Sequence, residues 1–149
     1  EDAYRRTRAT ESELHLDDLA PVAALERLVG FTFEHHYQNQ GFIRLVMNEN
    51  IQRGQFLAQS ALIEQLNKPA IQAIEQLYCR GVSSGVFRPG LNAVDIHESI
   101  SALSFFNVSN RYTFGLIFQR DPDCTIQLAQ RRSNVIDMVL RFVCVAQST

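Results

Sequence analysis

Two adjacent histidines, His35 and His36, carry the clearest potential for metal or acid–base chemistry in the chain. A metal site needs several ligands that converge on one point. Neighbouring positions on a helix point about 100° apart, and no histidine or carboxylate lies four residues from either one. The spacing therefore disfavours a metal site. Two interpretations remain: a histidine that hydrogen-bonds a ligand in a pocket, or a histidine whose polar atoms are satisfied inside the core.

Catalytic signatures give little support to an enzyme. The sequence has no His-Glu-x-x-His zinc motif and no glycine-rich phosphate loop. The adjacent carboxylates Asp17 and Asp18 are interpreted as a linker and helix cap rather than as an acid–base pair. We therefore expect no catalytic residue, no metal and no cofactor.

Aromatic and amide residues in the middle of the chain have the composition of a ligand pocket. Small-molecule sites are mostly apolar and contain a few polar groups that orient the ligand. Each phenylalanine can equally be simple core, and Asn48 can equally end its helix in solvent. The predicted ligand-binding residues are Phe31, His35, Asn48, Phe56, Phe105 and Asn107, with Phe114 as a further aromatic candidate.

The stretch 100–121 combines small, aromatic and polar residues. Just before and within it, Ser99, Ser101, Ala102 and Ser104 are small enough to let two helices approach closely. Further along, three polar residues need partners if they are buried, and they can serve a ligand, brace the following turn or form a dimer contact. These are Asn107, Asn110 and Arg111. We interpret this stretch as a hinge between a pocket and a dimer interface.

The elements that position these residues are all expected to be helices. Only four prolines and seven glycines occur, and no Asn-Gly or Asp-Gly hairpin signal is present. Asn67 is expected to cap one helix, with Pro69 in its first turn, and Asn92 to cap the next, with Asp95 three residues on. Gly85 is expected to be the left-handed residue at the C-terminal end of the first of these helices. The expected helices cover about 3–14, 21–37, 42–50, 67–85, 92–110, 114–118 and 122–145, with short helical pieces over 55–66.

The last helix carries two apolar stripes, which indicates that one of them faces a partner chain. One stripe repeats with alternating spacings of three and four residues, as in a coiled coil. The alternative is a single wide face buried within one protomer. We predict that the last two long helices form an intermolecular four-helix bundle. The predicted dimer-interface residues are Ile100, Ser104, Ile126, Ala129, Ser133, Ile136 and Leu140.

Length and composition limit the remaining possibilities. A chain of 149 residues predicts one domain over 1–149. The net charge is −2 and the 13 arginines are scattered, so we expect no DNA binding by this chain alone. Three widely separated cysteines are expected to be small buried thiols. No apolar run is long enough to span a membrane and no signal peptide is visible, so we expect a cytoplasmic protein with no membrane partner.

Three segments carry a resemblance to a known family: PVAALERLVGFTFEHHYQNQGFIRLVMNENIQRG, NKPAIQAIEQLYCRGVSSGVFRPG and ISALSFFNVSNRYTFGLIFQRD. With the order of elements, they resemble the C-terminal regulatory domain of the tetracycline-repressor (TetR) family. The resemblance implies an all-helical effector-binding and dimerisation domain. It also implies that residues 1–14 end the helix that links this domain to an N-terminal helix-turn-helix domain, absent from the sequence, which makes any contact with DNA.

The combined interpretation is a regulatory domain that forms a homodimer and binds a small-molecule effector, most simply within a repressor that the effector releases from DNA. In such regulators the ligand repositions the linking helix and changes the spacing of the two DNA-reading helices, which must match half-sites about one DNA turn apart. Two alternatives stay open. One is a stand-alone helical carrier of an apolar small molecule, and the other is a helical enzyme with titratable groups that converge in one cavity.

Overall fold

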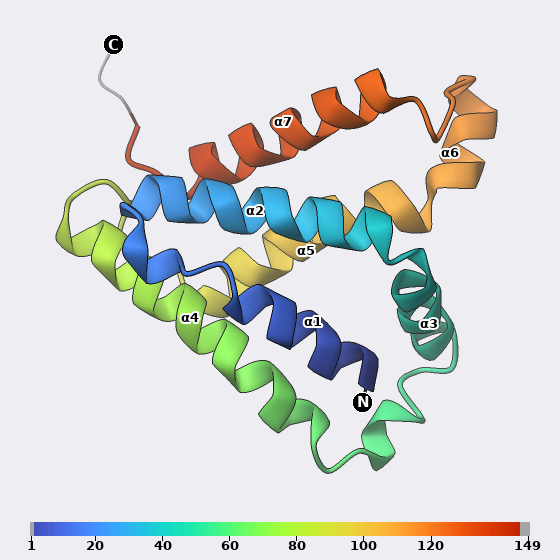
Figure 1. Cartoon of the computed structure of the whole chain (residues 1–149), viewed down its shortest axis with the longest axis horizontal. Coiled ribbons are helices and arrows are strands. Elements are labelled where there is room, and N and C mark those ends of the chain that lie inside the picture. The colour runs from blue at the N-terminus through green and yellow to red at the C-terminus, as the bar shows by residue number, and fades with distance from the viewer. Residues whose placement is uncertain (1, 147–149) are drawn as a thin grey trace.

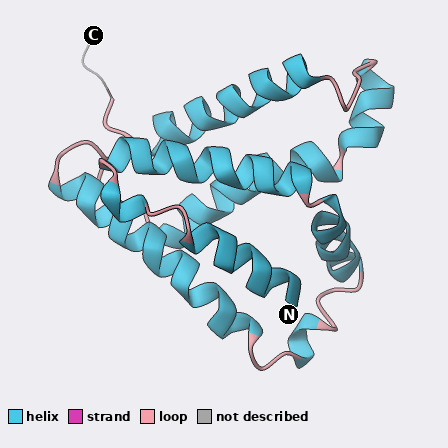
Figure 2. Cartoon of the chain, viewed as in Figure 1, coloured by secondary structure: helices cyan, strands magenta, loops and turns pink. Residues whose placement is uncertain are grey.

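The computed structural model describes residues 2–146, and this part of the chain is all-α (Figures 1 and 2). The seven helices are α1 (Asp2–Ser12), α2 (Pro21–Gln38), α3 (Gln40–Ile51), α4 (Ile63–Ser83), α5 (Ala93–Ser109), α6 (Arg111–Phe118) and α7 (Thr125–Val143). Two short 3₁₀ turns cover Leu16–Asp18 and Leu57–Gln59. An isolated β-bridge between Phe87 and Cys144 is the one extended pairing in residues 2–146. The expected all-α fold is confirmed.

Helix α5 lies at the centre of the bundle. It contacts α2, α3, α4, α6 and α7, while α1 packs along α4 (Figure 1). The α5 residues Ile96, Ile100 and Ser104 are spaced by four and are almost completely buried. They face a core to which α2 contributes Leu25 and Val29. The small residue Ser104 is therefore packed inside one protomer.

The start of α4 differs from the expectation. The helix begins at Ile63 rather than at Asn67, because the hydroxyl of Ser60 accepts the backbone N–H of Ile63 at 3.1 Å. The Asn67 side chain instead donates to the Ile63 carbonyl at 2.8 Å. Pro69 consequently lies inside the helix, where its missing N–H removes one rung of the hydrogen-bond ladder. The predicted Asn67 cap is wrong.

Two predicted helix ends are confirmed. The Asn92 side chain accepts the Asp95 N–H at 2.9 Å and caps α5. Gly85 takes the left-handed conformation with φ of 75° directly after α4. The N–H groups of Gly85 and Val86 return to the carbonyls of Val82 and Gly81, which is a Schellman motif.

The turn after α4 is joined to the end of α7. Phe87 is 2% exposed and its ring lies against Gly81. Arg88 N–H donates to the Val143 carbonyl at 2.9 Å, and Val145 N–H donates to the Val86 carbonyl at 3.0 Å. These bonds fix the position of α7 relative to α4, and hence the position of the outer face of α7.

The predicted dimer-interface residues lie in two different environments. Ile100, Ser104 and Ile136 are buried in the protomer's own core, so their side chains are not available to form an interface surface. Ile126 is 80% exposed, Ala129 and Ser133 are exposed, and Leu140 is half-buried. The regular repeat along α7 therefore does not correspond to a single exposed face.

Candidate functional site

A cavity of about 230 Å³ lies beneath α1, and we call it the inner cavity. Helices α1, α2, α3, α4 and α5 supply its walls, and α6 and α7 do not contribute. Its lining residues are Tyr4, Thr7, Arg8 and Glu11 of α1, Phe31, Thr32, His35 and His36 of α2, Phe42 and Val46 of α3, Asn67 of α4, and His97, Ser101 and Phe105 of α5.

The face of α1 that lines this cavity follows helical spacing. Tyr4, Thr7, Arg8 and Glu11 are separated by three, four and seven residues, which places them on one side of the helix. The residue types did not indicate a cavity-lining face, because an arginine and a glutamate usually indicate a solvent-exposed surface. One face of this charged helix therefore closes a cavity.

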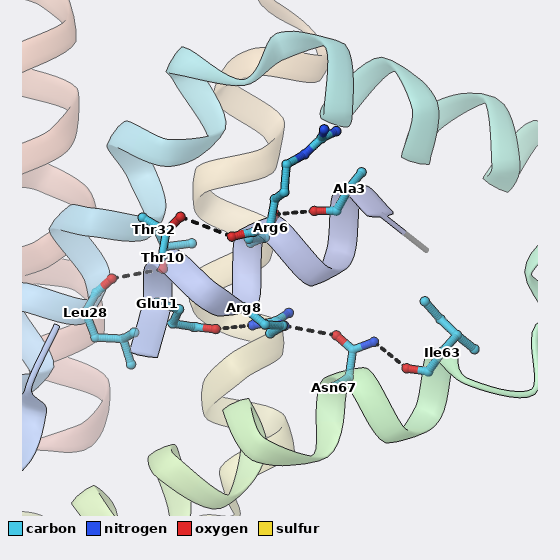
Figure 3. A network of polar contacts seen from close by, with 10 residues as sticks. Ala3, Arg6, Arg8, Thr10, Glu11, Leu28, Thr32, Ile63 and Asn67 are labelled. Carbon is cyan, nitrogen blue, oxygen red and sulfur yellow. Dashed lines mark hydrogen bonds and ion pairs between the residues drawn. The ribbon is translucent and has the colours of Figure 1, made fainter. Parts of the chain in front are cut away.

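Arg8 and Glu11 form an ion pair that is largely withdrawn from water, with side chains 17% and 15% exposed (Figure 3). The Arg8 Nε also donates to the Asn67 side-chain oxygen at 3.2 Å, and this bond joins α1 to α4. Because the guanidinium and the carboxylate neutralise each other, this wall of the cavity presents polar atoms without a net charge.

Three histidines also line the inner cavity. Burial lowers the pKa of His36 to about 4, helped by the neighbouring His35, His97 and Arg8. Burial also lowers the pKa values of His35 and His97. All three imidazoles are therefore neutral at pH 7, and each can donate and accept one hydrogen bond. The buried Nδ1 atom of His36 has no hydrogen-bond partner among residues 2–146.

Aromatic rings complete the inner cavity. Tyr4 and Phe42 meet edge to face with centroids 5.1 Å apart, and His36 meets Phe105 edge to face at 6.3 Å. Burial raises the pKa of Tyr4, so its hydroxyl stays protonated at neutral pH. The cavity thus combines apolar rings with neutral hydrogen-bonding groups, which suits an uncharged aromatic molecule that carries a few polar atoms.

Two more open hollows flank the inner cavity and share some of its lining. One, of about 700 Å³, lies between α1, α2 and α3 and shares Phe31 and His35. The other, of about 300 Å³, lies beside α3 and includes Tyr4, Glu49 and Phe56. The buried Glu49 carboxylate accepts the backbone N–H groups of Phe56 and Leu57, both at 2.8 Å, and so fixes the loop after α3.

The six predicted ligand-binding residues fall in different places. Phe31, His35 and Phe105 line the inner cavity. Phe56, 58% exposed, lines the hollow beside α3. Asn107, like Phe114, lines a separate cavity on the far side of α5, and the exposed Asn48 lines none of the cavities described. Whether these residues contact a ligand stays a prediction.

Sequence reasoning missed several polar residues of the inner cavity, namely Tyr4, Arg8, Glu11, Asn67 and His97. The spacing along α1 was the available signal for the first three. The other two come from different helices, and only the packing of α4 and α5 brings them together.

Arg111 has a structural role in the contact between α6 and α7. Its guanidinium is 6% exposed, forms an ion pair with Asp123 and lies over the Tyr37 ring at 5.6 Å. The Tyr37 hydroxyl also donates to Asp123 at 3.2 Å. Of the three roles open to Arg111, bracing the segment between α6 and α7 against α2 is the one these contacts support.

One stretch matches the Gly-x-Ser-x-Gly pattern of a hydrolase nucleophile. It is Gly81-Val82-Ser83-Ser84-Gly85, and it forms the end of α4 and its Schellman motif. A nucleophile elbow needs a sharp strand-to-helix turn, and this stretch has a helix in place of the strand. The match therefore has no catalytic geometry.

Other chemistry-bearing residues are dispersed. Within residues 2–146, no three histidine, cysteine, aspartate or glutamate side chains gather in a way that would hold a metal ion. Cys79 is exposed while Cys124 and Cys144 are half-buried, so the expectation of buried thiols is wrong for Cys79. No helix in the part of the chain that the structure describes is long and apolar enough to cross a membrane.

Comparison with known proteins identifies one family. The family described as "Tetracyclin repressor-like, C-terminal domain" matches residues 21–139, from the start of α2 to near the end of α7. No curated protein matches the chain.

Proposed function

The chain belongs to the tetracycline repressor-like C-terminal domain family, and we propose that it is the effector-binding and dimerisation domain of a transcriptional regulator. A domain of this family is a regulatory, non-enzymatic kind of domain. We further propose that a small uncharged effector binds in the inner cavity, and that this binding releases a repressor from DNA.

The observation that carries this proposal is the position of α1. Helix α1 closes the inner cavity with Tyr4, Thr7, Arg8 and Glu11, and it is tied to α4 by the Arg8–Asn67 hydrogen bond. Residues 1–14 are proposed to end the helix that leads to a DNA-binding region. We propose that a ligand in the cavity contacts α1 together with α2–α5 and shifts α1 relative to α4. Helix α1 would thereby transmit ligand binding to the DNA-binding region without a large rearrangement of the core.

Dimerisation is supported by apolar surface that a single protomer leaves uncovered. On α6, Leu116 is 82% exposed and Ile117 is 70% exposed. On α5 and α7, Phe106 is 48% exposed and Ile126 is 80% exposed. Large exposed apolar patches commonly mark protein–protein contacts. We propose that a second copy of the chain covers this surface, with α5 and α7 as the main contacting helices.

A cavity-filling experiment tests the effector site. The probe is 2-naphthol, a neutral aromatic molecule with one hydroxyl group, and binding is followed by its fluorescence. The variant Ser101→Phe places a ring in the inner cavity, whereas Ser83→Phe makes the same change on the exposed end of α4. We expect Ser101→Phe to abolish binding and Ser83→Phe to preserve it. Equal binding by both variants would refute the proposed site.

The carrier alternative shares the same cavity but needs no coupling to α1. It predicts that ligand binding leaves the backbone exchange of α1 unchanged relative to that of α4. The regulator proposal predicts a change confined to α1 and to the segment of α4 around Asn67, and hydrogen-exchange measurements with and without 2-naphthol separate the two.

A further inference from the structure

A second cavity of about 310 Å³ lies between α5, α6 and α7, and we call it the outer cavity. It shares no lining residue with the inner cavity, and α1, α3 and α4 do not contribute to it. Its volume is at the lower end of the range for small-molecule sites, ~300–1,000 Å³. The effector proposal leaves this space without a role.

The walls of the outer cavity are mainly aromatic and aliphatic. Phe106 of α5 and Phe114 of α6 meet edge to face, with centroids 6.0 Å apart and ring planes at 85°. Leu128 of α7 and Pro122 form part of the same lining. An aryl group can add a third ring to this pair in an offset or edge-to-face arrangement, which is the preferred geometry for aromatic contacts.

The chain reverses its direction after α6, and this turn adds the charged residue Arg120 to the mainly apolar lining. Gln119 adopts the left-handed conformation with φ of 52°, and Arg120 N–H donates to the Gly115 carbonyl at 2.9 Å. A Cβ atom at Gly115 would lie 2.8 Å from the Arg120 carbonyl oxygen, so the close approach of this turn requires glycine. The reversal places Arg120 in the lining, where Arg131 of α7 also contributes.

The charges around the outer cavity do not cancel. Arg111 is already paired with Asp123. Within residues 2–146, Arg120 and Arg131 form none of the ion pairs, and the one carboxylate of the lining is Asp121. The Asp121 carboxylate accepts the Asp123 N–H at 2.9 Å. The lining therefore includes two arginines without an ion-pair partner and one carboxylate that is partly engaged, so the lining carries a net positive charge.

We propose that the outer cavity binds an arylalkyl carboxylate. The aromatic group lies against Phe106, Phe114 and Leu128, and the carboxylate accepts hydrogen bonds from Arg131 and Arg120. Guanidinium groups match the geometry of a carboxylate and bind it more strongly than neutral donors bind a neutral acceptor. The N-terminal end of α7 carries the partial positive charge of the helix dipole, and its first turn lines the cavity with Gln127 and Leu128. This end therefore also favours a negatively charged ligand.

Three probes with the same phenylpropyl skeleton test the proposal, measured by titration calorimetry on the whole chain: 3-phenylpropionate, 3-phenylpropanol and 3-phenylpropylammonium. We expect one molecule of 3-phenylpropionate to bind per chain, about tenfold more tightly than the alcohol, because a charge-assisted hydrogen bond is lost in the alcohol. The ammonium compound is expected to bind more weakly than the alcohol. Added salt should weaken only the binding of the carboxylate.

Matched variants locate the site. Arg131→Gln and Arg120→Gln should each lower the affinity for 3-phenylpropionate about tenfold and leave the affinity for the alcohol unchanged. Arg44→Gln makes the same change at an exposed arginine of α3 and should alter neither affinity. Leu128→Trp should fill the cavity and abolish binding of both, with the helical circular dichroism spectrum confirming that each variant is folded.

Any of five results would overturn the proposal. Two concern the ligand: the absence of 3-phenylpropionate binding, and equal affinity for the carboxylate and the alcohol. Two concern the protein: binding that survives the Arg120→Gln/Arg131→Gln double variant, and binding that sedimentation shows to occur only when the protein dissociates. Loss of binding in Ser101→Phe but not in Leu128→Trp would also overturn it, because the carboxylate would then occupy the inner cavity. Failure of 2-naphthol to bind would affect only the effector proposal, so the two outcomes are distinguishable.

Discussion

The Arg8 side chain anchors α1 over the inner cavity, and a substitution of Arg8 tests this role directly. It pairs with Glu11 and donates to Asn67, both partly buried. Arg8→Gln leaves a carboxylate that is 15% exposed without its counter-charge, so we expect a loss of about 2 kcal/mol in unfolding free energy. Urea denaturation followed by circular dichroism measures this.

Arg5→Gln is the matched control for that measurement. Arg5 pairs with Asp2 on the same helix at the same i,i+3 spacing, but the two side chains are 57% and 82% exposed. Exposed ion pairs contribute little, so the control should lose less than about 0.5 kcal/mol. Equal losses in the two variants would mean that Arg8 does not anchor α1.

The pKa of His36 predicts a pH-dependent stability. The native imidazole has a pKa of about 4 against an ordinary value of 6.5, so between these values the unfolded chain binds a proton that the native chain does not. Stability therefore falls as the pH drops from 6.5 to 4, by at most about 3 kcal/mol from this residue. His36→Leu removes this contribution, and its unfolding free energy should vary less steeply with pH than that of the unchanged protein.

The lowered pKa values of His35 and His97 give the same sign, so some slope persists in the variant. The decisive quantity is the difference between the two pH profiles measured by urea denaturation. Superimposable profiles for His36→Leu and the unchanged protein would contradict a buried neutral imidazole at this position.

At the scale of elements, the end of α4 fixes the turn that reaches α7. A Cβ atom on Gly81 would lie 1.9 Å from a ring carbon of Phe87, which is far closer than two carbon atoms can approach. Gly81→Ala therefore forces Phe87 out of the core, and we expect a loss of about 2–3 kcal/mol despite the better helix propensity of alanine. Chemical denaturation gives the value.

Gly41→Ala tests that interpretation on another helix. Gly41 lies near the start of α3, and a Cβ atom added there would have no neighbouring atom within 4 Å. Alanine at this position should be neutral or should stabilise by up to about 1 kcal/mol. If both glycine substitutions change stability by the same amount, close packing on Phe87 is not what constrains Gly81.

The helices themselves could be predicted from sequence because their signals are local. Asn92 with Asp95, and Gly85 after an apolar repeat, each act within one turn of backbone, and both are confirmed. The start of α4 could not be predicted this way, because Ser60 binds the backbone N–H of Ile63 and a tertiary hydrogen bond from Arg8 holds the Asn67 side chain. An asparagine does not cap a helix N-terminus when its side chain is hydrogen-bonded to other groups.

The candidate site was less predictable for a related reason. Phe31, His35 and Phe105 share a cavity, as their aromatic or polar character suggested. Arg8 and Glu11 were missed because charged residues usually indicate solvent, and their burial depends on the helices that pack around α1. On α5, the small residue Ser104 was assigned to a partner chain, although a small residue allows an equally close approach inside one protomer.

At the scale of the whole molecule, the uncovered apolar surface predicts a homodimer. We expect sedimentation of the chain at tens of micromolar to give a dimer, and Phe106→Arg or Ile126→Arg to shift it to a monomer by weakening association about 30-fold or more. Val94→Arg changes a residue of α5 that is 56% exposed near the opposite end of the helix from Phe106, and it should leave the dimer intact. A chain that sediments as a monomer at this concentration would contradict the proposed dimerisation.

The central claim is that the inner cavity binds an uncharged effector against α1. The most direct test is an NMR titration of the chain with 2-naphthol, in which the imidazole signals of His36 and His97 and the backbone signals of Thr7 and Arg8 are followed. The account predicts saturable shifts in all four residues, with the signals around Phe114 in the outer cavity unchanged. Shifts confined to the outer cavity, or no saturable shift at His36 and Arg8, would contradict it.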